Sequence, residues 1–279
     1  VFERRGGYPP ELDNPDHLYR LGQTLGRIHR IGRAKPFLHR RDISSKRMAT
    51  ESRLFLEEQV IPRELMNAYS TLAKDCEQTA ASLLSTMTKR DMQRVHGDCH
   101  TGNILWRDDT PHFVDLDDCV SGPAIQDIWM FLSGDRFQQE RQLSEFVSGY
   151  DEFHEFDPRQ LAWIEALRTL RIMHHAFWLA SRWDDPAFPR AFPWFGQARF
   201  WSDPSWPARS SPIDRWMRPI SCPKNRQSQH PHRGQQLSRL HEHCPTSRPP
   251  RSDVLAPKTA YSHSMRAESM RGRDAHPSS

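Results

Sequence analysis

The chain has few of the features that mark secreted, zinc-binding and membrane-spanning proteins. Its five cysteines are odd in number and include no CxxC pair, which argues against a disulfide framework and a zinc ribbon. No apolar run approaches the length that a membrane span needs, and we expect no signal peptide. Reduced thiols suit a reducing compartment, so we expect a cytoplasmic protein without a membrane partner.

Apolar residues are also scarce, at 36% of the chain, and the charge is unevenly distributed. From Trp206 to Ser279 there are 13 Lys and Arg against 5 Asp and Glu, whereas the rest has 26 against 30. The net charge of +4 therefore comes from the C-terminal segment and does not predict binding to nucleic acid. We divide the chain into a catalytic region, residues 1–205, and a basic tail, residues 206–279, whose composition predicts disorder. A biological tail and a shifted reading frame both explain that segment, and we favour the second.

The spacing of apolar residues predicts a mostly helical catalytic region. A first helix follows the N-cap signal at 13–16 and ends near Gly32, with an inward face made of Leu18, Leu21, Leu25 and Ile28. Further helical patterns cover 63–87, 136–150 and 160–183, and a helix begins at 122–123. Gly22 and Gly26 are four residues apart, which would let a neighbouring element approach closely. The segment 35–46 is a loop rich in Arg and His, and 184–196 is expected to cover the body as an ordered loop.

Three short strands are predicted in the middle of the chain, at 93–95, 104–106 and 112–114. The last two are joined by a hairpin turn at 108–111. The fold class is therefore α+β, mostly helical, with a small β-hairpin that carries the catalytic loop. We expect the helices that precede these strands to pack beneath them.

The stretch 95–118, VHGDCHTGNILWRDDTPHFVDLDD, carries the strongest functional signal. Asp98 and Asn103 have the spacing of the kinase catalytic loop, H-x-D-x-x-x-x-N. Phosphoryl transfer from ATP needs one carboxylate to orient the attacking hydroxyl, with an amide oxygen and a second carboxylate to hold Mg²⁺. We assign Asp98 as the proton acceptor, Asn103 as a Mg²⁺ ligand, and Asp115 as a catalytic Mg²⁺ ligand that bridges the metal to the phosphates. Ordinary Asx turns would explain Asp98 and Asn103 alone, but the joint pattern disfavours them.

Neighbouring residues are assigned supporting roles. Gly97 and Gly102 allow tight turns on either side of the proton acceptor. His96 is expected to hold the loop through hydrogen bonds, and Asp127 to anchor the loop without touching substrate. These four residues would position the catalytic loop without taking part in the reaction.

Two more carboxylates, Asp117 and Asp118, follow the metal ligand closely. If the strand continues past Asp115, Asp117 shares its face and would assist the metal, whereas Asp118 points away. Hydrogen bonding behind the metal ligands is the role that we favour for both.

Zinc binding is an alternative interpretation, since His96, Asp98, Cys99 and His100 form a dense run of zinc-binding residue types. Adjacent Cys99 and His100 do not readily ligate one tetrahedral ion, and no distant partner stands out. The histidines at 174–175 fall on a predicted helix, where a core or surface role explains them better. We therefore favour Mg²⁺ over zinc.

Three segments, HGDCHTGNILW, FVDLDD and GPAIQDIWMFLSGD, resemble the aminoglycoside-phosphotransferase-like kinases, and the similarity extends over residues 1–201. Cys99 in the loop, the LDD ending and the segment DPAFP narrow the resemblance to bacterial Ser/Thr protein kinases of this family. The resemblance implies a two-lobed protein-kinase-like fold, ATP as donor with Mg²⁺, and phosphorylation of Ser and Thr hydroxyls of proteins. Carried onto this chain, it makes Asp98 the proton acceptor and Asn103 and Asp115 the magnesium ligands.

Two departures from the family pattern affect the expected activity. In the family, an N-terminal lobe before the position of Val1 supplies the lysine that contacts the phosphates and the loop that covers ATP. We therefore interpret residues 1–205 as the C-terminal lobe, assign no residue to ATP itself, and expect impaired activity from this chain alone. The tail replaces the last helix of the family. We further expect a monomer with protein substrates and no nucleic-acid partner.

Two other functions stay open. One is a small-molecule kinase acting on an aminoglycoside, choline or a homoserine-like alcohol, because the catalytic loop does not distinguish these acceptors from proteins. An acidic face would suit cationic acceptors, and four residues are candidates for it: Asp151, Glu152, Glu155 and Asp157. An acidic, solvated turn explains them more simply. The other function is that of a non-catalytic interaction protein or fragment.

Overall fold

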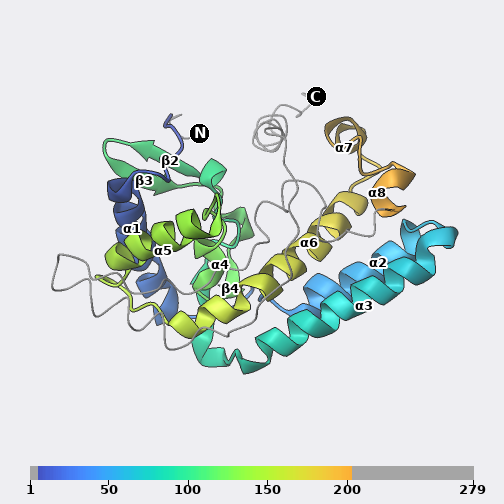
Figure 1. Ribbon diagram of the computed structural model, residues 1–279, viewed down its shortest axis with the longest axis horizontal. Helices are drawn as coiled ribbons and strands as arrows, with labels where there is room; N and C mark the ends of the chain where they lie inside the picture. Colours follow the sequence, from blue (N-terminus) through green and yellow to red (C-terminus); the bar gives the residue numbers. More distant parts are fainter. Residues whose placement is uncertain (1–5, 203–279) are drawn as a thin grey trace, which may run out of the picture. The chain divides into compact units, whose positions relative to one another are not determined.

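The computed structural model describes residues 6–202, apart from the side chains of 198 and 199 (Figure 1). Two compact units divide the chain, Val1–Cys244 and Pro245–Ser279, and the described residues belong to the first. This part consists of helices and two small antiparallel sheets, in agreement with the predicted α+β class. The predictions for the basic tail, residues 206–279, lie outside the described residues.

Helices α1 (Pro15–Ala34) and α5 (Arg136–Tyr150) pack against each other through glycines. A Cβ added at Gly22 would lie 2.0 Å from the main-chain oxygen of Phe146, and one added at Gly149 would lie 2.1 Å from that of Tyr19. Any side chain at these positions would push the two backbones apart. The close approach predicted at Gly22 is confirmed, and α5 has the predicted bounds.

The inward face of α1 differs from the predicted one at its C-terminal end. Leu18, Leu21 and Leu25 are buried as expected, but Ile28 is 38% exposed and the prediction for it was wrong. The buried position belongs to His29, which hydrogen-bonds to Tyr150 Oη at 2.8 Å. The prediction from hydrophobicity failed at the C-terminal end of this face, because a buried histidine can occupy a core position when it is hydrogen-bonded.

Helices α2 (Ser52–Gln59) and α3 (Met66–Leu83) lie along α6 (Ile164–Ala180), as Figure 1 shows. A π-helical turn, η1 (Lys46–Glu51), precedes α2 and also contacts α6. The expectation that the helix over 63–87 packs beneath the catalytic strands was wrong, because its small buried residues fit against α6. The helix that does contact the strands is α1, which packs on β1 and β3.

The strands form two separate pairs. Strand β1 (Gln93–Val95) pairs with β4 (Val120–Gly122), and β2 (Ile104–Arg107) pairs with β3 (Thr110–Phe113). The predicted hairpin between β2 and β3 is confirmed, and its turn has φ of 50° at Asp108 and 55° at Asp109, as in a type I′ turn. Strand β4 was not predicted.

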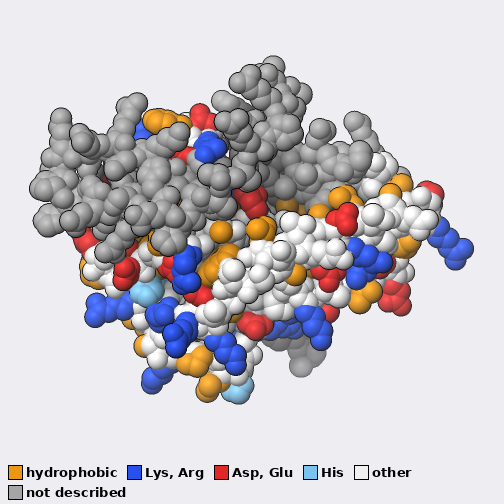
Figure 2. All heavy atoms as spheres, turned by 60° about the horizontal axis from the view of Figure 1, so that its bottom comes forward, with side chains coloured by type: hydrophobic (Ala, Val, Ile, Leu, Met, Phe, Trp, Pro, Cys, Tyr) orange, Lys and Arg blue, Asp and Glu red, His pale blue; other side chains and the backbone are white. Residues whose placement is uncertain are grey.

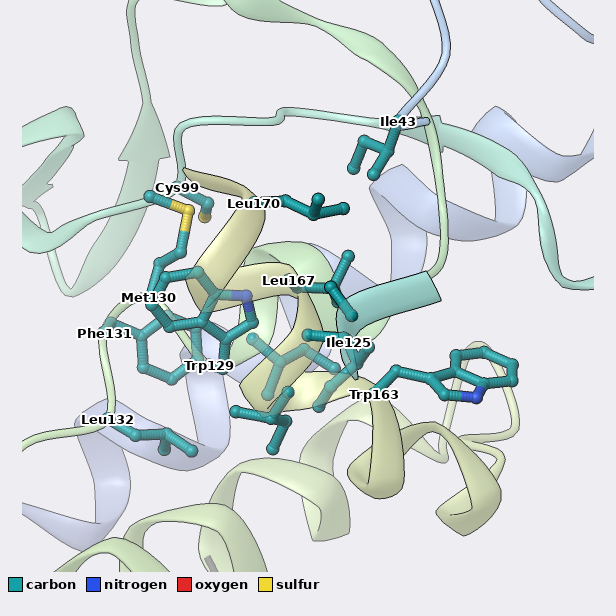
Figure 3. Packing of buried hydrophobic residues seen from close by; sticks show 14 of the residues in the cluster. Ile43, Cys99, Ile125, Trp129, Met130, Phe131, Leu132, Trp163, Leu167 and Leu170 are labelled. Atoms are coloured by element: carbon teal, nitrogen blue, oxygen red, sulfur yellow. The ribbon is translucent and has the colours of Figure 1, made fainter. Parts of the chain in front are cut away.

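The core joins the catalytic loop to the C-terminal helices (Figure 3). Ile125 of α4 (Ile125–Ile128) and Trp129 lie near Leu167 of α6 in one buried cluster, which also contains Leu132 and Leu170. Short 3-10 turns connect the elements: η2 (Arg63–Leu65), η3 (Leu84–Thr86), η4 (Lys89–Asp91), η5 (Thr101–Asn103), η6 (Leu116–Asp118) and η7 (Pro158–Trp163).

The segment after α6 covers the body through aromatic side chains, as predicted for 184–196. Phe192 and Phe195 are buried, and the backbone forms α7 (Ala187–Ala191) within the predicted loop and α8 (Ala198–Ser202) after it. On the face shown in Figure 2, acidic and basic side chains are interspersed in small groups. None of the described helices is both long enough and apolar enough to cross a bilayer.

Candidate active site

The loop between β1 and β2 carries the predicted proton acceptor, and its shape depends on glycine. Gly97 has φ of 85°, and a Cβ there would lie 2.4 Å from the main-chain oxygen of Asp118. Only glycine combines this conformation with such a close backbone contact. The loop therefore passes directly against the segment that follows the predicted metal ligand Asp115.

Asn103 lies next to Asp98, as the spacing of the motif predicted. Its side-chain amide nitrogen donates to the main-chain oxygen of Asp98 at 2.9 Å and to the carboxylate oxygen Oδ2 at 3.3 Å. With the nitrogen turned toward Asp98, the amide oxygen points away from it. Magnesium prefers oxygen ligands, so this oxygen has the right chemistry and direction to hold a metal beside the carboxylate.

The carboxylate of Asp98 is paired with a residue that the sequence did not indicate. Arg171 of α6 donates a hydrogen bond to Oδ1, and His100 Nε2 lies 3.5 Å from Oδ2. Burial by itself would raise the pKa of Asp98, but the charge of Arg171, followed by His100, holds this pKa far below its usual value of 3.8. Asp98 is therefore ionised at neutral pH, as a group that accepts a proton or orients a hydroxyl must be.

His96 and Asp127 support the loop in the way that was predicted. The Nε2 atom of His96 donates to the main-chain oxygen of Val114 at 2.8 Å. Asp127 is completely buried and accepts hydrogen bonds from the main-chain nitrogens of His96 at 2.7 Å and Gly97 at 2.8 Å. Its Oδ2 atom is also 2.9 Å from Nε2 of His29 on α1. This buried carboxylate thus ties the catalytic loop to α1.

Asp115 has a left-handed backbone, with φ of 63° and ψ of 62°. Its neighbour Val114 donates from the main-chain nitrogen to the oxygen of Asn103 at 3.0 Å, so Asp115 begins directly beside that residue. A non-glycine residue in this region costs about 1–2 kcal/mol, and such outliers concentrate at functional sites. The turn takes the carboxylate of Asp115 out of the strand direction and into solvent.

The strand does not continue past Asp115, so the condition under which Asp115 and Asp117 would share a strand face is not met. The 3-10 turn η6 follows instead. Asp118, which was expected to point away, lies near the proton acceptor: partial burial, followed by the charge of Asp98, raises its pKa. Two carboxylates thus face one region, which a cation would stabilise.

The zinc alternative does not fit this geometry. Cys99 is completely buried, burial raises the pKa of its thiol well above 9.0, and its side chain packs in the core (Figure 3). His96 is engaged with Val114. Over residues 6–202, no three His, Cys, Asp or Glu side chains are grouped so that they could hold a metal ion.

Sequence reasoning missed the basic residues at the site. Arg171 is one of two arginines on α6, and only the fold shows that it reaches Asp98. Arg40 was noticed as part of the Arg- and His-rich loop, without a role. Its guanidinium donates to the main-chain oxygens of Asp117 and Cys119 and so holds the segment after Asp115.

Comparison with known proteins places this site in a family. A model described as the phosphotransferase enzyme family matches residues 1–164, more than half of the chain. The chain belongs to this family. It is 44% identical over 202 residues to stress response kinase A of Escherichia coli (strain K12). It is 42% identical over 203 residues to serine/threonine protein kinase RdoA of Salmonella typhimurium (strain LT2). Both alignments cover 72% of this chain and 61% of the relative, so the chain spans about three fifths of the length of these relatives.

Solved structures of other phosphotransferases have the same fold. A choline/ethanolamine kinase family protein from Mesorhizobium loti superposes with a TM-score of 0.52 at 14% identity, covering 77% of this chain and 72% of that one. Amicoumacin kinase hAmiN, in complex with AMP-PNP, Ca²⁺ and Ami, superposes with a TM-score of 0.50 at 20% identity, covering 70% and 61%. At these identities the likeness confirms the kinase-like fold and does not extend to the acceptor.

Proposed function

We propose that the protein transfers the γ-phosphoryl group of ATP, with Mg²⁺, to Ser and Thr hydroxyls of proteins. The observation that carries this proposal is the ionised carboxylate of Asp98, held between Asn103 and Arg171 on a rigid loop. Membership of the phosphotransferase family and similarity to stress response kinase A support it.

Asp98 would accept a hydrogen bond from the attacking hydroxyl and orient its oxygen toward the phosphorus. Phosphoryl transfer requires little covalent chemistry from the protein, so Asp98 would act mainly through its position and its charge. Asp127 and His96 keep the loop in place during the reaction, since both hold its main chain through hydrogen bonds. Asp98 is the catalytic residue of this scheme, and the other two are positioning residues.

Asn103 and Asp115 would hold Mg²⁺ through one amide oxygen and one carboxylate. Magnesium keeps several waters and takes its other ligands from phosphates, so a site with few protein ligands fits it. When bound there, the ion would offset the negative charge of the phosphates. Asn103 fits because its amide nitrogen is turned to Asp98, which leaves the amide oxygen for the metal. Asp115 fits because it is an exposed carboxylate whose neighbour Val114 is hydrogen-bonded to the main chain of Asn103.

The acidic face proposed for a cationic small-molecule acceptor has structural roles instead. Glu152 accepts hydrogen bonds from Tyr19 and Gln23 of α1. Asp151 accepts from the main chain of Phe156, and Asp157 caps the 3-10 turn η7. These contacts support the interpretation as a turn. A small-molecule acceptor remains the second candidate, because the fold is shared with such kinases.

The experiment measures transfer of the γ-phosphoryl of radiolabelled MgATP by the protein that carries this chain. Replacing Asp98 by Asn removes the charge at nearly constant shape and should lower the rate by about 100- to 10,000-fold. Asp109→Asn, in the exposed hairpin turn, changes the same charge and should leave the rate unaltered. Acid hydrolysis of the product shows whether phosphoserine and phosphothreonine formed, and full transfer by Asp98→Asn would refute the assignment.

A further inference from the structure

Four arginines surround one histidine beside the catalytic loop, and we call them the basic cluster. Arg171 lies on α6 and Arg182 in the turn that follows it, while Arg41 lies before η1 and Arg47 within η1. His174 lies on α6 at their centre. Burial, and then the charges of Arg47, Arg171, Arg41 and Arg182, lower the pKa of His174 to about 4. All four charges therefore act on the same imidazole, which is itself neutral at pH 7.

Hydrogen bonds attach the basic cluster to the active site. Arg171 pairs with Asp98. The main-chain oxygen of Arg41 accepts from the nitrogen of Ser121 in β4 at 3.0 Å, which places this segment against the strand that follows Asp118. On the other side, Ser52 bridges His174 Nδ1 at 3.4 Å and the main-chain oxygen of Arg47 at 3.5 Å. The cluster thus extends from Asp98 along one side of α6.

The acidic groups nearby offset part of these charges. Asp98 and Asp118 act on Arg171, and Asp42 and Glu51 act on Arg47. Arg47 also donates from Nη2 to the main-chain oxygen of Asp42, and its Nε atom is buried without a hydrogen-bond partner in the described part of the chain. Arg182 rests over the ring of Trp178 at 4.8 Å, and Arg182 and Arg41 are both exposed. These two arginines therefore present positive charge to solvent.

We propose that the basic cluster binds an anionic side chain, a carboxylate or a phosphate, close to the Ser or Thr that is phosphorylated. Guanidinium groups pair with both anions through parallel hydrogen bonds, and clusters of arginine recognise acidic and phosphorylated peptides. The same charges repel aminoglycosides and choline, which are cationic. This inference rests on the proposed function and specifies its substrate as an acidic or phosphorylated protein segment.

The test measures binding of fluorescent Ser-containing peptides to the 279-residue chain by anisotropy. The peptides differ only in the residues beside Ser, which are Glu, phosphoserine, Gln or Lys, so the first two separate the carboxylate from the phosphate. We expect both anionic peptides to bind at least about tenfold more tightly than the Gln peptide, and the difference to shrink in high salt. The double variant Arg41→Gln/Arg182→Gln should lose this preference and still bind the Gln peptide, which shows that it is folded.

The matched control is Arg30→Gln/Arg63→Gln, which removes two exposed charges outside the cluster and should keep the preference. Equal binding of the Glu, phosphoserine and Gln peptides would overturn the inference, as would a preference that survives in the cluster variant or binding too weak to detect for every peptide. Because binding is measured without catalysis, these outcomes are independent of the Asp98→Asn transfer assay. That assay alone decides the proposed function.

Discussion

Arg171 on α6 donates a hydrogen bond to the carboxylate of Asp98 in the catalytic loop. The pair joins a helix from the C-terminal part of the described chain to the residue that orients the attacking hydroxyl in the proposed reaction. Asp98 stays ionised although the residue is mostly enclosed by protein, because the charges and hydrogen bonds of Arg171 and His100 together outweigh the effect of burial on its pKa.

Replacing Arg171 by Met should therefore change the pH dependence of the reaction. With Arg171 present, the pKa of Asp98 is far below its usual value, so this residue stays ionised throughout the range of a rate assay. Without Arg171, burial raises the pKa of Asp98, and the rate should decline on the acid side at a higher pH. The measurement is kcat from about pH 5 to pH 8. Arg63→Met, which removes an exposed charge outside the basic cluster, is the control, and identical acid limbs for Arg171→Met and wild type would contradict the prediction.

Asp115→Asn should weaken the binding of Mg²⁺ while it leaves the backbone unchanged. Asparagine tolerates the left-handed conformation as well as aspartate does, so only the charge is lost. We expect the Mg²⁺ concentration for half-maximal binding of a fluorescent ATP analogue to rise about tenfold or more. The matched control is Asp108→Asn, which also has a positive φ and lies in the hairpin turn. A midpoint equal to that of wild type would remove Asp115 from the metal site.

Asp127→Asn should destabilise the fold, because it removes a fully buried charge that satisfies two main-chain nitrogens and His29. The amide nitrogen of asparagine is itself a hydrogen-bond donor, and it would face groups that donate to the carboxylate in wild type. Loss of one partner in such a buried network costs about 3 kcal/mol or more in the free energy of unfolding. Urea denaturation followed by circular dichroism measures this cost. The exposed Asp75→Asn serves as the control, and a cost for Asp127→Asn no larger than for Asp75→Asn would show that the network is dispensable.

Gly22→Ala tests the contact between α1 and α5. Alanine is favoured over glycine inside a helix by about 1 kcal/mol, so an open site would be stabilised. Here the added Cβ would lie 2.0 Å from the main-chain oxygen of Phe146, so the helices must separate. We expect a net loss of about 2–3 kcal/mol in the free energy of unfolding. Gly6→Ala, whose Cβ meets nothing within 4 Å, should not show this loss. A stabilised Gly22→Ala would mean that the helices are farther apart.

The stability of the fold should decrease as the pH falls from 6.5 toward 4. Burial, followed by the charges of nearby arginines, lowers the pKa of His174 and of His175 from 6.5 to about 4. In this window the unfolded chain binds protons that the folded chain does not, so the free energy of unfolding rises with pH. The variant His174→Gln/His175→Gln should show a shallower slope in urea titrations across the window. The exposed His39→Gln should retain the slope of wild type, and an unchanged slope in the double variant would be the contrary result.

The helices and the catalytic loop were predictable because their signals are local. The apolar period placed α1 and α5 within a few residues, and the hairpin turn was marked by a pair of aspartates. The spacing of Asp98 and Asn103 predicted their contact, since five residues separate them along one loop. The errors occurred where a neighbour distant in sequence decides the outcome. Ile28 is exposed because its neighbour His29 takes the buried position and hydrogen-bonds to α5 and to Asp127. Helix α3 packs against α6 instead of the strands, because its small residues fit there.

The sequence by itself determined the elements, the family and the chemical types in the catalytic loop, because period, turn residues and motif spacing depend on residues close together in the chain. Only the tertiary structure decided that Arg171 pairs with the ionised Asp98 and that Asp118 faces the same region. It also decided that Arg41, Arg47 and Arg182 lie near His174. Those relations depend on electrostatic contacts across long stretches of chain, and such contacts exist only after the helices and loops have packed.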